Sequence, residues 1–178
     1  MRIALALLAA LAASPSAAAG FDLPPRKPGQ WEMKIAVDTA AMPPQVILMC
    51  LDEETDKLLN QRFGGMASSM CSRQEQSKDG DALVLESVCQ LGDMRTESRS
   101  VVTGDFDSAY TMKTSVTMSG SNAPGGLKNV APGGPQSQQT TIEARRTGAC
   151  DAKYKPGDID LGMGRTLNVR EMPEPKMQ

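Results

Sequence analysis

The sequence predicts a small, mainly β domain, borderline α+β: an antiparallel meander sheet of five or six strands with one short helix and two disulfide bonds. Three observations predict it. Apolar and polar residues alternate with period two in several runs, the pattern of strands with one buried face. Short turns join these runs, so consecutive strands are expected to pair antiparallel. Four cysteines in a chain with an export-type N-terminus imply two disulfides.

The first 19 residues have the three-part pattern of a cleavable signal peptide. Arg2 gives a positive start, residues 3–13 are an unbroken apolar run, and residues 17–19 are alanines at the expected cleavage site. An apolar run of about 11 residues is shorter than the roughly 20 that a bilayer requires. We therefore expect cleavage after about Ala19, a periplasmic location, and no stable membrane span after cleavage. Residues 20–178 are then expected to form one domain.

The mature chain is mildly acidic and poor in aromatic residues. Without Arg2 the 19 basic residues become 18, against 21 acidic ones, so the net charge is −3. This balance argues against nucleic-acid binding by phosphate neutralisation. Aromatic residues make up only 3% of the chain, so the core is built from aliphatic side chains and methionine. Such a thin core makes covalent cross-links more valuable.

Two strands are predicted near the start of the mature chain. Residues 21–30 are an extended, proline-rich entry that cannot form regular structure. Residues 31–37 alternate as a strand, and Trp31 is expected on its buried face. Residues 45–50 are almost wholly apolar, which predicts a strand buried on both faces.

One helix of about 10 residues is predicted directly after the second strand. Asp52 is a good N-cap residue, and Glu53 and Glu54 place negative charge in the first turn. The helix is expected to span residues 53–62, because Gly64-Gly65 is expected to end it.

The remaining strands follow one another through short turns. They are predicted over residues 70–76, 82–91, 95–102, 110–118 and 139–147. Residues 119–138 are rich in Gly, Pro, Ser, Asn and Gln and are predicted to form a flexible loop. From Pro156 onward the chain is predicted to be loop.

The predicted hairpin around Gly80 decides between the three possible disulfide pairings. A turn centred on Gly80 places Cys71 opposite Cys89, within the Cα separation of about 4.4–6.8 Å that a disulfide tolerates. Cys50 then pairs with Cys150. A zinc site is the alternative, but the cysteines show no C-x-x-C spacing and the chain has no histidine.

The sequence lacks the motifs of the common enzyme classes. The absence of histidine removes the most frequent general base and the usual activator of a nucleophile. Carboxylates do lie in pairs that could act as an acid and a base or bind calcium. These pairs are Asp105 with Asp107, Asp158 with Asp160, and Asp52 with Glu53. Asp is also a frequent turn residue, which is the preferred interpretation, and no catalytic residue is assigned.

Twelve methionines are many for a chain of this length. Thioethers bind Cu(I), and the candidates are Met66 with Met70, four residues apart, and Met112 with Met118 on one strand face. Methionine also fills irregular cores, which is the preferred interpretation for a chain with few aromatic residues. No metal ligand and no cofactor is assigned.

A set of short motifs occurs in a fixed order along the mature chain. They are Lys27-Pro28-Gly29-Gln30-Trp31-Glu32, Cys50-Leu51-Asp52, Gly104-Asp105-Phe106 with Tyr110-Thr111, Gly148-Ala149-Cys150, and Lys155-Pro156-Gly157-Asp158-Ile159. In this order they resemble a bacterial family of exported proteins, domain-of-unknown-function family 3617. The resemblance implies location and size but no established activity. Family members usually carry an aromatic residue just before the last Gly-x-Cys, where this chain has Arg146, so the packing there is expected to differ.

These observations favour a non-enzymatic binding or accessory protein of the bacterial envelope. A curved antiparallel sheet can hold a small apolar ligand or a strand of an envelope protein. The alternatives are copper handling by methionine and an enzyme that uses carboxylates without histidine. The ligand-binding residues are not identified by the sequence.

Overall fold

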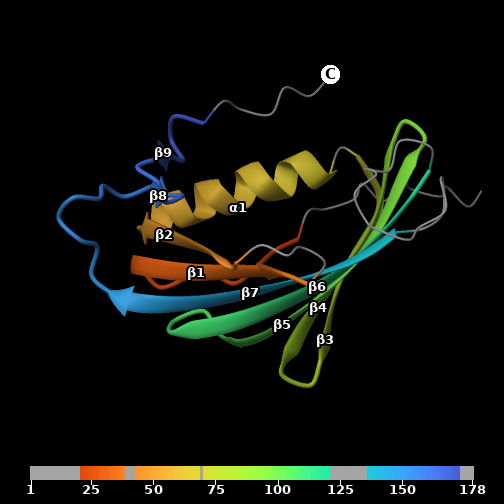
Figure 1. Ribbon diagram of the computed structural model, residues 1–178. Helices are drawn as coiled ribbons and strands as arrows, with labels where there is room; N and C mark the ends of the chain where they lie inside the picture. The colour runs from red at the N-terminus through yellow and green to blue at the C-terminus, as the bar shows by residue number, and fades with distance from the viewer. Residues whose placement is uncertain (1–20, 39–42, 69, 121–135, 173–178) are drawn as a thin grey trace, which may run out of the picture.

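The computed structural model describes residues 21–38, 43–68, 70–120 and 136–172. These residues form a strongly curved antiparallel sheet of nine strands, with a helix lying inside the curve (Figure 1). The helix is α1 (Glu53–Ser68). The strands are β1 (Gly29–Val37), β2 (Gln45–Leu51), β3 (Cys71–Asp79), β4 (Ala82–Leu91), β5 (Met94–Asp105), β6 (Ala109–Ser119), β7 (Gln136–Gly148), β8 (Asp158–Asp160) and β9 (Thr166–Asn168).

The strand order in the sheet is β3-β4-β5-β6-β7-β1-β2-β8-β9. The antiparallel pairing and the single helix agree with the prediction for the described residues, but the number of strands is nine instead of five or six. The sheet is also not a simple meander, because β2 does not pair with β3. Instead α1 carries the chain across the inside of the curve, and β7 returns to pair with β1.

Two short strands lie where the sequence predicted only loop. β8 pairs with β2, and β9 pairs with β8, so the chain after Pro156 extends the sheet. These strands bury Ile159, and Val169 just after β9 is completely buried. Three residues are too few for a periodic pattern, which is why the sequence does not reveal them.

Two other strands differ from their predicted form. β7 begins at Gln136, inside the segment 119–138 that was predicted to be a flexible loop. Residues 121–135 of that segment lie outside the described residues. β2 is not buried on both faces along its length, because its first two residues, Gln45 and Val46, are exposed, Val46 to 49%.

The predicted N-cap of α1 is confirmed, but the predicted end is wrong. The Thr55 amide donates to Asp52 Oδ1 at 2.7 Å, and the Asp52 amide donates to Thr55 Oγ1 at 2.9 Å. This reciprocal pair satisfies two backbone donors at the helix start. The helix then continues through Gly64 and Gly65 to Ser68. Glycine costs only about 1 kcal/mol relative to alanine in a helix, so it weakens a helix without having to end it.

The two disulfides join the predicted partners, Cys50 with Cys150 and Cys71 with Cys89. The first ties the end of β2 to the segment after β7, across 100 residues of sequence. The second ties β3 to β4 across 18 residues. Both bonds therefore hold sheet elements together directly.

The pairing of Cys71 with Cys89 depends on a bulge that the sequence did not reveal. β3 and β4 are joined by a two-residue loop, with Asp79 opposite Ala82. That register alone would place Ser72 opposite Cys89, but a shift between Cys71 and Arg73 brings Cys71 there. The two Cα atoms are 3.7 Å apart, which is below the expected range of about 4.4–6.8 Å.

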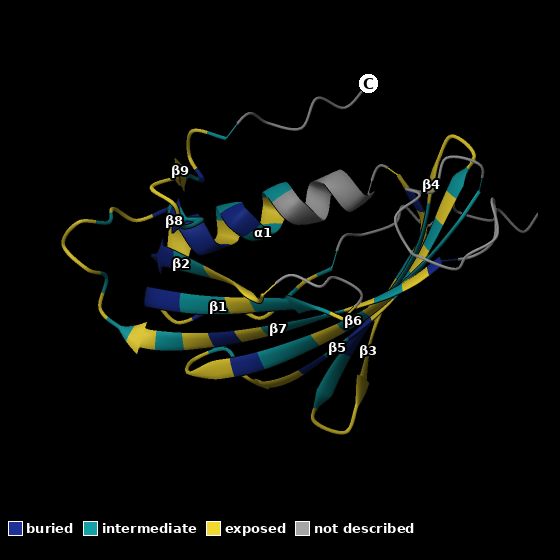
Figure 2. Ribbon diagram, in the orientation of Figure 1, coloured by how far each residue is buried: buried dark blue, intermediate teal, exposed yellow. Residues whose placement is uncertain are grey.

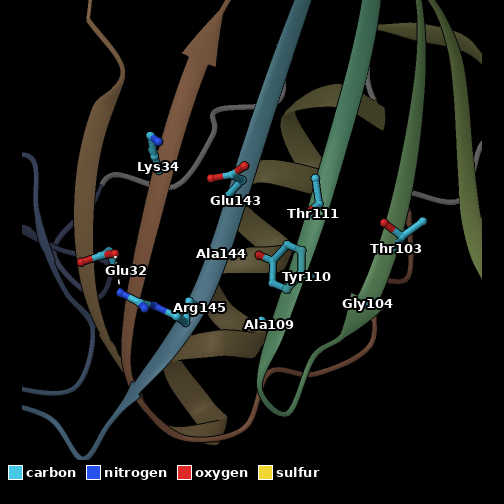
Figure 3. A pocket seen from close by; sticks show the side chains of 10 residues that line it. All are labelled: Glu32, Lys34, Thr103, Gly104, Ala109, Tyr110, Thr111, Glu143, Ala144 and Arg145. Carbon is cyan, nitrogen blue, oxygen red and sulfur yellow. Dashed lines mark hydrogen bonds and ion pairs between the residues drawn. The ribbon is translucent and has the colours of Figure 1, made fainter.

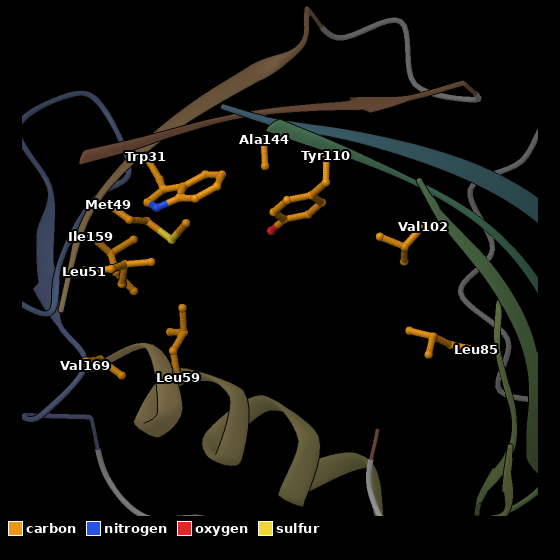
Figure 4. Packing of buried hydrophobic residues seen from close by; sticks show 10 residues of the cluster. All are labelled: Trp31, Met49, Leu51, Leu59, Leu85, Val102, Tyr110, Ala144, Ile159 and Val169. Atoms are coloured by element: carbon orange, nitrogen blue, oxygen red, sulfur yellow. The ribbon is translucent and has the colours of Figure 1, made fainter. Parts of the chain in front are cut away.

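The core lies between α1 and the side of the sheet that faces it, which we call the inner face. Figure 2 shows buried residues on the described first part of α1 and on the strands that face it. Figure 4 shows these side chains pointing from the sheet and from α1 into the space between them. The cluster consists of Trp31, Met49, Leu51, Leu59, Leu85, Val102, Tyr110, Ala144, Ile159 and Val169. The predicted core position of Trp31 is confirmed, since the residue is fully buried.

We expect the long-range disulfide to contribute more stability than the local one. Replacing Cys50 and Cys150 together by serine should lower the free energy of unfolding by about 4–5 kcal/mol in the chain-entropy account, and replacing Cys71 and Cys89 by about 3 kcal/mol. Urea unfolding of the two double variants against the unaltered protein measures both losses. A larger loss in the Cys71/Cys89 variant would contradict this expectation.

Candidate functional site

The inner face changes from apolar to polar along the strands. Leu85 and Val102 belong to the core, and strand alternation places every second residue from them on the same face. Farther along these strands many inner positions carry hydroxyl and amide side chains, which we call the polar band, and Val116 and Met118 of β6 lie among them on the same face. The polar band consists of Gln74, Ser87, Ser98, Ser100, Thr114, Gln138 and Thr140.

Hydroxyl groups of the polar band bond to one another in pairs. The Ser87 and Ser98 hydroxyl oxygens are 2.7 Å apart, and those of Ser100 and Thr114 are 2.8 Å apart. These bonds join β4 to β5 and β5 to β6. Hydroxyl pairs of this kind let a sheet carry polar groups on a half-buried face without a large desolvation cost.

Gln74 differs from the paired hydroxyl groups of the polar band because its side-chain amide has no hydrogen-bond partner among the described residues. Its side-chain nitrogen and oxygen are both buried, and neither has a hydrogen-bond partner in the described part of the chain. A buried polar atom without a partner costs about 1–3 kcal/mol. Gln74 lies directly opposite Ser87. A group that both donates and accepts hydrogen bonds would therefore be stabilised at this place.

Residues 21–28, which we call the entry segment, lie between α1 and the inner face (Figure 1). The Asp22 amide donates to Gln76 Oε1, and Gln76 Nε2 donates to the Asp22 carbonyl, both at 2.9 Å. Farther along, the Lys27 amide donates to the Phe106 carbonyl at 3.0 Å. The side chains of Phe21 and Leu23 pack against the core cluster. The entry segment thus covers part of the inner face.

A buried ion pair fixes the entry segment to α1. Arg26 Nε lies 2.6 Å from Asp56 Oδ1, and the two side chains are only 7% and 2% exposed. The Arg26 amide also donates to Asp56 Oδ2 at 3.0 Å. Tyr110 lies next to this pair: burial raises the pKa of its hydroxyl, and the nearby Arg26 charge partly offsets that rise. The phenol therefore stays protonated at neutral pH.

The outer face of the sheet carries a shallow groove of about 520 Å³ (Figure 3). Its charged side chains point away from α1, which lies behind the sheet in this view. Glu32 and Arg145 form an ion pair at 3.1 Å, while Lys34 and Glu143 lie opposite each other in the register. These charges alternate in sign and are solvent-exposed or half-exposed, and exposed ion pairs contribute little. The groove has the character of a solvated sheet surface.

The carboxylates singled out in the sequence take part in local structure. Asp105 Oδ1 accepts from the Asp107 amide at 2.8 Å, and Asp105 Oδ2 accepts from the Ser108 hydroxyl at 3.0 Å. The bond from the Asp107 amide, followed by the Ser108 hydroxyl, lowers the pKa of the Asp105 carboxyl. This is the turn chemistry that the sequence favoured. Asp52 acts as the helix cap, and Glu53 is exposed.

The second aspartate pair holds the C-terminal strands in place. Asp158 accepts from the Asn168 side chain and the Lys155 amide, each at 2.8 Å. Asp160 accepts from the Tyr154 hydroxyl and, at 2.8 Å, from the Gly162 amide. The Tyr154 bond is the main cause of the lowered pKa of Asp160. Among the described residues, no group of three or more His, Cys, Asp or Glu side chains is arranged to hold a metal ion.

Of the two methionine pairs named in the sequence, Met112 and Met118 have described side chains, and these do not converge. Met112 and Met118 share the inner face of β6, but six residues of strand separate them by roughly 20 Å. Met112 packs against the core cluster. Met70 is 43% exposed just before β3, and the Met66 side chain lies outside the described residues.

Sequence reasoning missed the residues that organise the inner face. Arg26 stands in a proline-rich run without periodicity, so nothing marks it as buried. Asp56 did carry a signal, because it lies three residues before the buried Leu59 and therefore on the same side of the helix. Gln74 and Gln76 lie in a strand that is polar on both faces, so its sequence does not show which side faces inward.

The fold and the inner face define a disulfide-linked β-sheet protein with a helix inside its curve. A family model described as "Protein of unknown function (DUF3617)" matches residues 26–150, and the chain belongs to this family. No curated protein and no solved structure matches the chain. No helix in the described ranges is long and apolar enough to cross a membrane.

Arg146, the position at which the chain departs from the usual family pattern, lies at a register shift opposite Trp31. Its Nε donates to the Pro28 carbonyl at 2.8 Å. The guanidinium thus binds the end of the entry segment by a hydrogen bond. This contact accounts locally for a charged residue at this position.

We expect Asp56 to be essential for stability, because its loss leaves the Arg26 charge buried without a partner. Asp56→Ala should lower the free energy of unfolding by about 3–5 kcal/mol. Glu54→Ala removes a carboxylate from the same helical turn whose side chain is 78% exposed, so it should change stability little. Urea unfolding of both variants provides the comparison. Equal effects would show that the buried pair does not have this role.

Proposed function

We propose that the chain is an exported, non-enzymatic binding protein of the bacterial envelope whose inner face holds a mainly apolar ligand with a polar end. The observation that carries the proposal is the graded inner face, with apolar side chains near α1 and the polar band beyond them. Gln74 marks the polar end, because both of its amide atoms are buried without partners among the described residues.

Two parts of the inner face would bind two parts of the ligand: apolar side chains would contact its apolar part, and the polar band would hydrogen-bond its polar end. Apolar ligand surface would gain about 25 cal/mol for each Å² removed from water against the partly buried inner-face residues Leu83 and Met112. A polar end would pair with Gln74 and the neighbouring Ser87. Sites for small molecules commonly combine an apolar lining with a few such polar groups.

The carboxylate and methionine alternatives have less support. Asp52, Asp105 and Asp160 all have lowered pKa values because they accept hydrogen bonds from the local structure. A general acid at neutral pH needs the opposite shift. The separation of Met112 from Met118 gives copper no shared thioether site. Binding without catalysis is the function that these contacts favour.

Export is the second part of the proposal. It is supported by the signal-peptide pattern of residues 1–19 and by two disulfides, which persist in oxidising compartments. We expect the periplasmic fraction of a bacterial host to contain a chain that begins at about Gly20. Intact mass and N-terminal sequencing measure the start of the chain. A protein that keeps residues 1–19 and remains in the cytoplasmic fraction would refute export.

A dansyl-labelled undecanoic acid tests the ligand class, because it joins an apolar chain to a polar end. We expect saturable binding, with Gln74→Ala weakening it roughly five- to ten-fold through the loss of one hydrogen-bonding side chain. Gln139→Ala is the matched control, since Gln139 lies on the outer face of β7. Fluorescence titration measures both affinities. Absence of saturable binding to the unaltered protein would rule out this ligand class.

A further inference from the structure

We infer that residues 21–25, the first part of the entry segment, are a displaceable cover that occupies the inner face in competition with a ligand. This inference rests on the proposed function, because it concerns access to the same face. It assigns a role to a segment of the chain that the sequence marks only as an irregular, proline-rich entry.

The structure holds the entry segment mainly by its main chain. Side chains or carbonyls of other elements bond to the Asp22 amide and carbonyl, the Arg26 amide, and the Lys27 amide and carbonyl. Prolines at positions 24, 25 and 28 have no amide hydrogen and cannot join a sheet ladder. The segment is therefore attached at separate points and not through continuous strand pairing.

These points divide the entry segment into a weakly held part and a strongly held part. Residues 26–28 are fixed by the buried Arg26–Asp56 pair and by the bond from Lys27 to the Phe106 carbonyl. Before Arg26, the hydrogen bonds of the entry segment within the described residues are the two between Asp22 and Gln76. Releasing Gln76 from Asp22 would thus leave residues 21–25 held by the packing of Phe21 and Leu23 against the core cluster, which an apolar ligand can replace, while Arg26 stays in place.

The position of Gln76 links this release to the polar band. Gln76 lies two residues after Gln74 on β3, so both side chains belong to the inner face. Phe21 and Leu23 cover the core on the same side of the sheet. A ligand that extends from the polar band toward the core would meet residues 21–25.

Cleavage of the signal peptide during export would make it easier for residues 21–25 to leave the inner face. If cleavage occurs after about Ala19, residues 21–25 lie at the free end of the mature chain. A free end can leave its site without straining a closed loop. The buried Arg26–Asp56 pair would then act as the fixed point about which the end moves.

Gln76→Ala tests the cover in the exported chain that begins at about Gly20, with Ser77→Ala as control because Ser77 is exposed on the opposite face of β3. We expect Gln76→Ala to bind the dansyl-labelled undecanoic acid roughly ten-fold more tightly, because two hydrogen bonds no longer compete with the probe. Ser77→Ala should match the unaltered protein. By NMR, the Asp22 amide should exchange faster with solvent in Gln76→Ala, while the Arg26 amide stays protected.

The unaltered protein provides a second measurement that does not depend on a variant. Saturating probe should accelerate exchange at the Asp22 amide and leave the Arg26 amide protected. Bound probe without faster Asp22 exchange, or equal affinities in Gln76→Ala and Ser77→Ala, would overturn the cover and leave the proposed function standing. Failure of the probe to bind either the unaltered protein or Gln76→Ala would overturn both.

Discussion

The arrangement of the inner face depends on the buried pair of Arg26 and Asp56. The pair joins the entry segment to the first turn of α1, beside Tyr110 on the sheet. A buried ion pair contributes little net stability when intact, yet loss of one partner leaves a charge in a poor environment. The pair therefore acts as a positional constraint. It fixes where the helix and the entry segment lie relative to the sheet, and thereby which part of the inner face is covered.

The covalent links complement this constraint in a chain with few aromatic residues. Trp31 and Tyr110 supply most of the aromatic contribution to the core cluster, with ring centroids 5.9 Å apart. The disulfide between Cys50 and Cys150 lies near the same end of the sheet, since Cys50 pairs with Gln30 beside Trp31. The end that contains the aromatic core is thus cross-linked by Cys50–Cys150, and the polar band farther along the strands lies next to the second disulfide, Cys71–Cys89.

The sequence predicted those strands in which burial of one face produces an alternation of apolar and polar residues. It did not reveal features that depend on contacts between residues far apart in the chain. β1, β4 and β6 bury one face each, so their residues alternate visibly. The Arg26–Asp56 pair joins residues 30 apart, and charged residues are ordinarily expected at the surface. β3 is polar on both faces, so only its pairing with β4 shows that Gln74 and Gln76 face inward. The residues of the candidate site are therefore placed by tertiary contacts, which the local alternation of apolar and polar residues does not reveal.

The same contacts that complete the fold also determine what the inner face can bind. A sheet whose inner face were apolar throughout would be closed by the helix and would serve stability alone. Here the apolar part meets α1, while Gln74 and the paired hydroxyls continue beyond it on the same strands. The entry segment bridges the two parts, fixed at Arg26 and more lightly held at Asp22. Because its attachment weakens toward Asp22, the proposed release of residues 21–25 would uncover the inner face and remove Phe21 and Leu23 from the edge of the core, while the Arg26–Asp56 pair stays in place.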